Sequence, residues 1–243
     1  MITSVRASVV PLVRNFRGFA SSRLLNWKLR RIQEQCRNFT MISRDGFIDN
    51  LRLIDSVKNI PGCVVECGVW RGGMSAGMAM FLGPGRKYYL FDSFEGLPPA
   101  KPIDGEAANH WQQNREAPGY FDNCSAPEKF ATSAMTMAGV ASFRIVKGWF
   151  DRTLPIERMR EPIAVLRLDG DWYESTTTCL EHLFGQVSVG GVVIFDDYYT
   201  WDGCSRAVHD FLSRHSRPER VRTFGYFAYL LKLPESSGAV DAE

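Results

Sequence analysis

The sequence predicts an α/β fold built around a doubly wound, mostly parallel sheet of seven strands. Apolar runs of strand length alternate with helical patterns from residue 63 to residue 233. Several runs, such as GGVVIF at 190–195, are apolar almost throughout, which is typical of strands covered on both faces. The connections are short, and parallel neighbours require crossover helices of this kind. With 243 residues, the chain is long enough for one such domain.

The elements are expected in a regular order. A helix over 44–60 comes first, because Phe47, Leu51 and Ile54 recur at helical spacing before a Pro-Gly pair ends the pattern. Strands are then expected at 63–69, 87–94, 142–150, 163–170, 190–198, 220–225 and 227–233, with helices at 72–83, 127–139, 175–187 and 204–215. The last two strands are expected to form an antiparallel pair at the edge of the sheet.

Two segments fall outside this alternation. Residues 1–43 are expected to form a basic N-terminal helical arm, because the first 33 residues carry Lys and Arg but no acidic residue. A solvated arm or a subunit-contact helix is favoured over a transit peptide or a membrane-surface helix. Residues 97–127 are polar and rich in Pro, Asn and Gly, so they are expected to form a long loop that is either functional or disordered. One domain over 44–243 therefore follows the arm.

Composition narrows the range of partners. The net charge of +2 and the absence of a basic stripe with interleaved aromatics argue against nucleic acid. The six cysteines lack CxxC or zinc-like spacing, which favours buried thiols and a reducing, cytoplasmic location. No apolar run approaches the roughly 18 residues of a membrane-spanning helix. We expect a small-molecule acceptor as the partner, and assembly into a homo-oligomer.

Ligands of open α/β sheets bind beyond the carboxyl ends of the strands, so the polar residues at those ends are the candidates. The first strand ends in ECGVWRGGMS, where Gly68 permits close approach of a ligand and the next helix offers free N–H groups. Glu66 would be a poorly placed charge there unless it had a function. Tight strand-to-helix packing is the alternative explanation of the glycines, and the pattern is neither GxGxxG nor a P-loop.

The second and third strands add further candidates. Asp92 follows Gly68 by 24 residues, a spacing suited to a carboxylate that binds a ribose hydroxyl pair. Capping of a turn by Asp92 or Ser93 is the alternative. At the end of the third strand, Trp149 or Phe150 could lie against a flat base, or both could be ordinary core aromatics.

Aspartates follow the fourth and fifth strands. If these strands are neighbours, Asp169, Asp196 and Asp197 meet at one end of the sheet, where they would repel one another without a cation. A hard divalent ion would resolve that repulsion, and Mg²⁺ is the ion that we expect, whereas solvated caps are the alternative. Asp171 lies two residues after the first of these ligands, close enough to abstract a proton from a nearby group.

The motifs VVECGVWRGGMS, YLFDSFEGLP, VKGWFDRTLP, LRLDGDWYEST and GGVVIFDDY occur in this order between about Arg44 and Leu233. As a set they resemble the macrocin O-methyltransferase (TylF-type) family, class I enzymes that use S-adenosylmethionine and Mg²⁺. The resemblance implies a Rossmann-like methyltransferase domain, with Asp171 as general base and Mg²⁺ on Asp169, Asp196 and Asp197. The cofactor-binding residues that we expect are Met41, Glu66, Gly68, Trp70, Ser75, Asp92, Ser93, Trp149 and Asp169.

Members of this family methylate sugar hydroxyls of glycosylated natural products, so the resemblance implies an O-methyltransferase of a sugar-bearing metabolite or saccharide. Two other functions stay open. A metal-dependent glycosyltransferase is one, because the spacing of Asp169 and Asp171 also suits a nucleotide sugar. A non-catalytic S-adenosylmethionine-binding module is the other. The segment 97–127 matches no pattern of the family, and it leaves the acceptor undefined.

Overall fold

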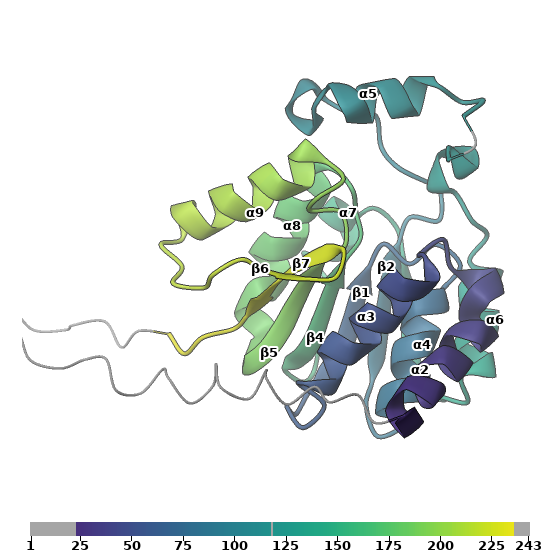
Figure 1. Cartoon of the computed structure of the whole chain (residues 1–243). Helices are drawn as coiled ribbons and strands as arrows, with labels where there is room; N and C mark the ends of the chain where they lie inside the picture. Colours follow the sequence, from purple (N-terminus) through teal and green to yellow (C-terminus); the bar gives the residue numbers. More distant parts are fainter. Residues whose placement is uncertain (1–22, 118, 236–243) are drawn as a thin grey trace, which may run out of the picture.

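The computed structural model describes residues 23–117 and 119–235. A seven-stranded sheet with the order β3-β2-β1-β4-β5-β7-β6 forms its centre (Figure 1). The strands are β1 (Cys63–Cys67), β2 (Tyr88–Asp92), β3 (Phe143–Lys147), β4 (Ile163–Leu168), β5 (Val187–Phe195), β6 (Arg222–Phe224) and β7 (Phe227–Leu231). The predicted α/β class and the seven strands are confirmed.

The predicted antiparallel pair at the edge of the sheet is confirmed. The antiparallel strand is β7, which pairs with both β5 and β6, so it lies inside the sheet and β6 forms the edge. Burial explains this order, because every residue of β7 is buried whereas those of β6 are half-buried or exposed. The more apolar strand, β7, therefore lies between two neighbouring strands, whereas β6 has a neighbour on one side alone.

Helices cover the two faces of the sheet. On one face lie α2 (Arg23–Cys36), α3 (Arg44–Asp55), α4 (Gly73–Leu82) and α6 (Lys129–Met137). On the other lie α7 (Phe150–Thr153), α8 (Tyr173–Leu183) and α9 (Asp202–Arg214). The helix expected at 44–60 ends five residues early, at Asp55. Each face has its own hydrophobic cluster, and the strand order reverses between β1 and β4, where a crevice for a ligand is expected.

The predicted N-terminal arm needs correction for the part that the structure describes. Leu29, Ile32 and Cys36 of α2 are buried in the same cluster as α3 and α4. Residues 23–36 therefore belong to the core of the domain, because one apolar stripe of α2 packs inward while its basic residues face solvent. Residues 1–22, also part of the predicted arm, lie outside the described residues. No helix among those described is long and apolar enough to cross a membrane.

The segment predicted as a long loop is folded. It contains η3 (Pro102–Asp104), α5 (Glu106–Gln113) and η4 (Phe121–Cys124), and it arches over one end of the sheet (Figure 1). We call residues 97–117 and 119–124 the cap. Gln112 accepts a hydrogen bond from Ala100 N at 2.7 Å and donates to Pro98 O at 2.9 Å, and Asn123 Nδ2 donates to Leu97 O at 2.7 Å. Side-chain amides thus satisfy backbone groups that no strand or long helix pairs.

Asp104 joins the cap to the first turn of α8. Its side chain is 3% exposed and accepts hydrogen bonds from Tyr173 N and Lys101 N, each at 2.7 Å. Removal of a carboxylate that caps a helix N-terminus typically costs about 0.5–2 kcal/mol.

We expect Asp104→Ala to lower the free energy of unfolding by about 1–2 kcal/mol in urea denaturation, because two backbone N–H groups lose their acceptor. Asp202→Ala is the matched control, since Asp202 is exposed and pairs with Arg206 at the surface. Its loss should stay below about 0.5 kcal/mol. Equal losses in the two variants would show that Asp104 does not hold the cap.

Candidate active site

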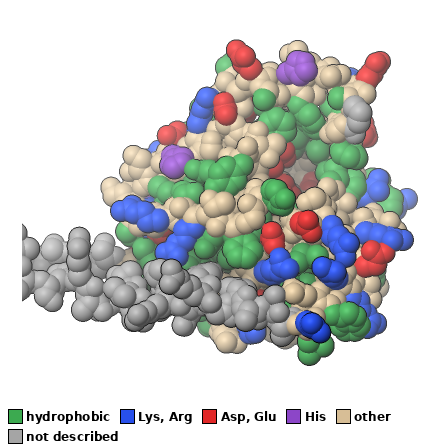
Figure 2. Space-filling model, viewed as in Figure 1, with side chains coloured by type: hydrophobic (Ala, Val, Ile, Leu, Met, Phe, Trp, Pro, Cys, Tyr) green, Lys and Arg blue, Asp and Glu red, His purple; other side chains and the backbone are tan. Residues whose placement is uncertain are grey.

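A cavity of about 760 Å³ lies between the carboxyl ends of the strands and the cap. Figure 2 shows this hollow on the surface, with acidic side chains inside it and apolar side chains around it. Residues that follow β1 through β5 line the cavity, and so do residues of the cap. Its size is within the range of small-molecule sites.

The turn after β1 lies against the turn after β4. Gly68 has a φ of 86°, and a Cβ atom at this position would lie 1.8 Å from the carbonyl oxygen of Asp169. Only glycine allows this approach. Trp70 also has a positive φ, 49°, and its indole donates to Ser125 O at 3.2 Å. The backbone of this turn therefore borders the cavity, which Gly68 and Trp70 both line.

Asp92 stands at the end of β2 and holds the same turn. Its Oδ2 accepts hydrogen bonds from Val69 N at 2.6 Å and Trp70 N at 2.8 Å, while Oδ1 accepts from Phe94 N at 2.6 Å. Burial raises the pKa of Asp92, and the three N–H donors oppose that shift. Asp92 also lines the cavity, together with Met41, Ser93 and Trp149.

Two predicted cofactor residues do not line the cavity. Glu66 is 1% exposed, and it accepts hydrogen bonds from the Ser75 hydroxyl and from Arg167 Nη1, the latter at 2.7 Å. Ser75 is likewise buried, at 2%. Burial raises the pKa of Glu66 to about 7, and the charge of Arg167 opposes the shift. In this structure both side chains support Arg167 instead of facing a cavity ligand.

Arg167 is the residue that sequence reasoning missed. It is fully buried in β4, and its guanidinium pairs with Glu66 at 2.7 Å and with Asp169 at 2.8 Å through Nη1, and with Asp196 at 2.7 Å through Nη2. Although burial disfavours its charge, the three carboxylates raise the pKa of Arg167 above its ordinary value. The signal was present in the sequence, because a lone arginine in a strand covered on both faces requires anionic partners.

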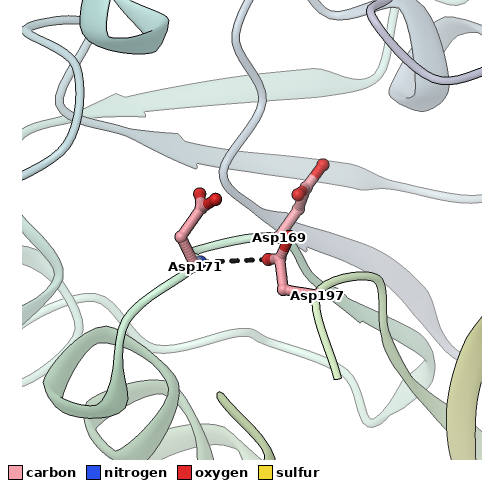
Figure 3. A group of neighbouring side chains, drawn as sticks. All are labelled: Asp169, Asp171 and Asp197. Carbon is pink, nitrogen blue, oxygen red and sulfur yellow. Dashed lines mark hydrogen bonds between the residues drawn. The ribbon is translucent and has the colours of Figure 1, made fainter. Parts of the chain in front are cut away.

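The carboxyl ends of β4 and β5 meet as expected, with Leu168 opposite Phe195. One carboxylate oxygen each of Asp169, Asp171 and Asp197 lies within 4.8 Å of the others (Figure 3). We call these three residues the aspartate cluster. The predicted ligand set contained Asp196 in place of Asp171. Asp196 also lines the cavity, and its Oδ1 pairs with Arg167, as Asp169 Oδ2 does. Which of these carboxylates bind a metal stays a prediction.

Electrostatics in the aspartate cluster favour a cation. Burial raises the pKa of Asp171 and of Asp197, and repulsion between the carboxylates adds to both shifts. Burial also raises the pKa of Asp169, with Arg167 acting against it. A hard divalent ion prefers such oxygen donors and would relieve the repulsion.

Asp171 is held in an uncommon conformation. Its φ is 60°, a region that residues other than glycine seldom occupy. Its backbone N–H donates to Asp197 Oδ2 at 3.0 Å (Figure 3), and its Oδ1 accepts from the indole Nε1 of Trp201 at 2.7 Å. Uncommon backbone conformations that the surrounding structure maintains are often found at functional sites.

Comparison with known proteins gives consistent results. A family model described as Macrocin-O-methyltransferase (TylF) matches residues 29–229. The 8-demethyl-8-(2,3-dimethoxy-alpha-L-rhamnosyl)-tetracenomycin-C 4'-O-methyltransferase of Streptomyces olivaceus is 38% identical over 177 residues, 69% of this chain and 66% of the relative. The demethyldecarbamoylnovobiocin O-methyltransferase of Streptomyces niveus is 36% identical over 172 residues, 68% of this chain and 64% of the relative.

Among solved structures, the O-methyltransferase NovP superposes with a TM-score of 0.67 at 30% identity, covering 81% of this chain and 83% of NovP. The chain thus aligns with slightly less than two thirds of the length of the two curated relatives and with most of NovP.

Proposed function

The chain belongs to the macrocin O-methyltransferase (TylF) family, and from this premise we propose that it transfers the methyl group of S-adenosylmethionine to a hydroxyl of a sugar in a glycosylated natural product or related saccharide. The observation that carries the proposal is one cavity that joins the turn at Gly68 and Asp92 to the carboxylate of Asp171. The Streptomyces olivaceus relative, whose name specifies a rhamnosyl substrate, supports a sugar acceptor.

The donor side of the cavity suits S-adenosylmethionine. This cofactor supplies an electrophilic methyl group on a positively charged sulfur. We propose that the backbone at Gly68 borders its methionine part, where a Cβ atom would close the turn. Asp92 would accept hydrogen bonds from the ribose hydroxyls, and Trp149 would lie against the adenine. The carboxylates around the cavity favour a cationic donor.

The aspartate cluster suits a divalent cation, and we propose Mg²⁺ held by Asp169 and Asp197. Such an ion supplies Lewis acidity toward the acceptor hydroxyl. We propose Asp171 as the general base, because Trp201 holds its Oδ1 and leaves Oδ2 for the proton of the acceptor. The main further contribution of the protein would be to align the acceptor oxygen with the methyl group of the cofactor.

The two other functions suggested by the sequence have less support. Membership in a methyltransferase family argues against a nucleotide-sugar glycosyltransferase. The half-buried Asp171, oriented by Trp201 and Asp197, argues against a non-catalytic module. The six cysteines carry free thiols, five of them buried. A cytoplasmic location and assembly into a homo-oligomer stay predictions.

Transfer of radiolabelled methyl groups from S-adenosylmethionine to a panel of sugar glycosides tests the proposal. We expect labelled product with Mg²⁺, a loss of at least about 100-fold with EDTA, and recovery when Mg²⁺ is restored, because the cation polarises the hydroxyl. Asp169→Ala should resemble the EDTA-treated protein, whereas Asp45→Ala, at an exposed position on α3, should not.

Full activity in EDTA would contradict the metal assignment but leave methyl transfer intact. Binding of S-adenosylmethionine without transfer to any sugar, in a panel that includes rhamnosides, would contradict the proposed activity.

A further inference from the structure

The turn that joins β5 to α9 holds Asp171 at two points. Asp197 Oδ2 accepts the backbone N–H of Asp171 at 3.0 Å, and the indole Nε1 of Trp201 donates to Asp171 Oδ1 at 2.7 Å. The backbone N–H of Trp201 in turn donates to Asp197 O at 2.9 Å. These three residues therefore form a closed ring of hydrogen bonds, in which Trp201 is the member that holds the side chain of Asp171.

Trp201 holds Asp171 in a different way from that in which the neighbouring carboxylates are held. Asp169 and Asp196 each pair with the guanidinium of Arg167. In the part of the chain that the structure describes, no Lys or Arg side chain pairs with Asp171, and its carboxylate is oriented by the indole N–H. Hydrogen bonds are directional, so this one donor determines where the other carboxylate oxygen points.

The cap supports Trp201 through two further tryptophans. Trp111 of α5 and Trp172, which precedes α8, pack edge-to-face against Trp201, with ring centroids at 5.9 Å and 5.3 Å. Trp172 is 2% exposed, and its indole donates to Pro98 O of the cap at 2.8 Å. Edge-to-face packing favours one orientation of each ring, so the cap helps to fix the orientation of Trp201.

The cap also contacts the helix that Trp201 begins. Trp201 is the N-cap residue of α9, and Arg206 Nη1 of the same helix donates to Ile103 O of the cap at 2.6 Å. Gly203 lies so close to the cap that a Cβ atom there would be 2.3 Å from Asp104 Oδ1. A displacement of the cap would therefore disturb the start of α9, and with it Trp201.

We infer that Trp201 is a positioning residue for methyl transfer. Its indole N–H directs Asp171 Oδ2 toward the acceptor hydroxyl, and the cap keeps Trp201 in the orientation that this requires. The inference rests on the proposed function, because it takes Asp171 as the general base. Loss of the alignment should slow the chemical step and leave the binding of S-adenosylmethionine unchanged, since alignment of the reacting groups contributes to kcat.

An isosteric replacement tests the N–H group alone. Benzothiophene keeps the shape and faces of indole but has no N–H, and it is introduced as 3-benzothienylalanine in place of Trp201. Because Trp201 also lines the cavity, the ring preserves the surface that the acceptor meets. With the most active glycoside of the panel, we expect kcat to fall about tenfold, while KM and the Kd for S-adenosylmethionine change less than about twofold.

The matched control is the same replacement at Trp27, which is exposed on α2 and does not line the cavity. It should keep the parent kcat. An unchanged kcat after replacement of Trp201, or a rise in KM with kcat preserved, would overturn the inference.

Hydrogen exchange separates a failure of this inference from a failure of the proposed function, because it needs no turnover. The chain has six tryptophans, and nitrogen-15 labelling gives each indole N–H an NMR signal, with that of Trp201 assigned from Trp201→Phe. We expect Asp171→Ala to speed exchange at Trp201 at least about tenfold, because the N–H loses its acceptor. Equal rates in parent and variant would contradict the inference whether or not any sugar is methylated.

The support from the cap has its own variants. Trp111→Ala should speed exchange at the Trp201 indole at least about threefold and lower kcat, because one of the rings that orient Trp201 is removed. Trp111→Phe should restore most of both, since it keeps an aromatic ring. Trp27→Ala should leave exchange at Trp201 unchanged. An unchanged exchange rate at Trp201 in Trp111→Ala would overturn the role of the cap.

Discussion

Asp171→Asn should lower kcat by about 10²–10⁴-fold, the usual contribution of a positioned general base. The amide keeps the shape of the side chain, and its oxygen can still accept the hydrogen bond from Trp201 Nε1. It cannot take the proton of the acceptor hydroxyl. Single-turnover methyl transfer measures the chemical step, and calorimetry measures the affinities for S-adenosylmethionine and Mg²⁺.

These affinities separate the two roles open to Asp171 within the aspartate cluster. A general base predicts that both stay within about threefold of the parent protein. A fall in Mg²⁺ affinity of more than tenfold would instead make Asp171 a metal ligand, in the position first predicted for Asp196. Asp45→Asn, on the exposed surface of α3, controls for loss of a carboxylate elsewhere and should keep the parent kcat.

Arg167→Met should lower the free energy of unfolding by about 3–5 kcal/mol, the typical loss when one partner of a buried ion pair is removed. Methionine fills much of the same space but leaves Glu66, Asp169 and Asp196 without their shared cation. Urea denaturation at pH 7 measures the loss. Arg37→Met is the control, because Arg37 pairs with Glu34 at the surface and should contribute less than about 1 kcal/mol.

The pH dependence of this deficit follows from the carboxylates. Without Arg167, burial holds the folded-state pKa of Glu66 above its unfolded value, so stability is lost as the pH rises through the folded pKa. The difference between variant and parent should therefore shrink as the pH falls from 7 to 5. Adding Glu66→Gln to Arg167→Met should recover part of the loss. A deficit that is small at pH 7, or unaffected by Glu66→Gln, would show that Arg167 does not hold the carboxylates together.

The sequence was most informative where a repeating pattern reports local structure. Alternation of apolar runs and helical spacing predicted the strands to within a few residues, and the end of each run predicted which polar residues face the cavity. Asp92, Asp169 and Asp197 line it for that reason. The pattern was less informative for α2, where the many basic residues suggested a solvated arm although Leu29, Ile32 and Cys36 are buried.

The cap was missed because its structure depends on contacts that have no period in the sequence. Gln112 and Asn123 satisfy backbone groups across the cap, and Asp104 reaches α8 from 69 residues away along the chain. The helix α5 has eight residues, of which Ala108 is buried, and so short a segment is marginal without its tertiary partners.

By itself, then, the sequence determined the class of fold and the edge of the sheet at which chemistry is expected, because strand period and the position of charges along the chain are local properties. The tertiary structure decided which of the carboxylates pair with Arg167 and which of them lie together in the aspartate cluster. Asp196 pairs with Arg167, Asp171 joins Asp169 and Asp197, and Glu66 is buried behind them. The reason is electrostatic, since the arrangement of several carboxylates depends on the distance of each from one buried guanidinium, and only the packed sheet sets those distances.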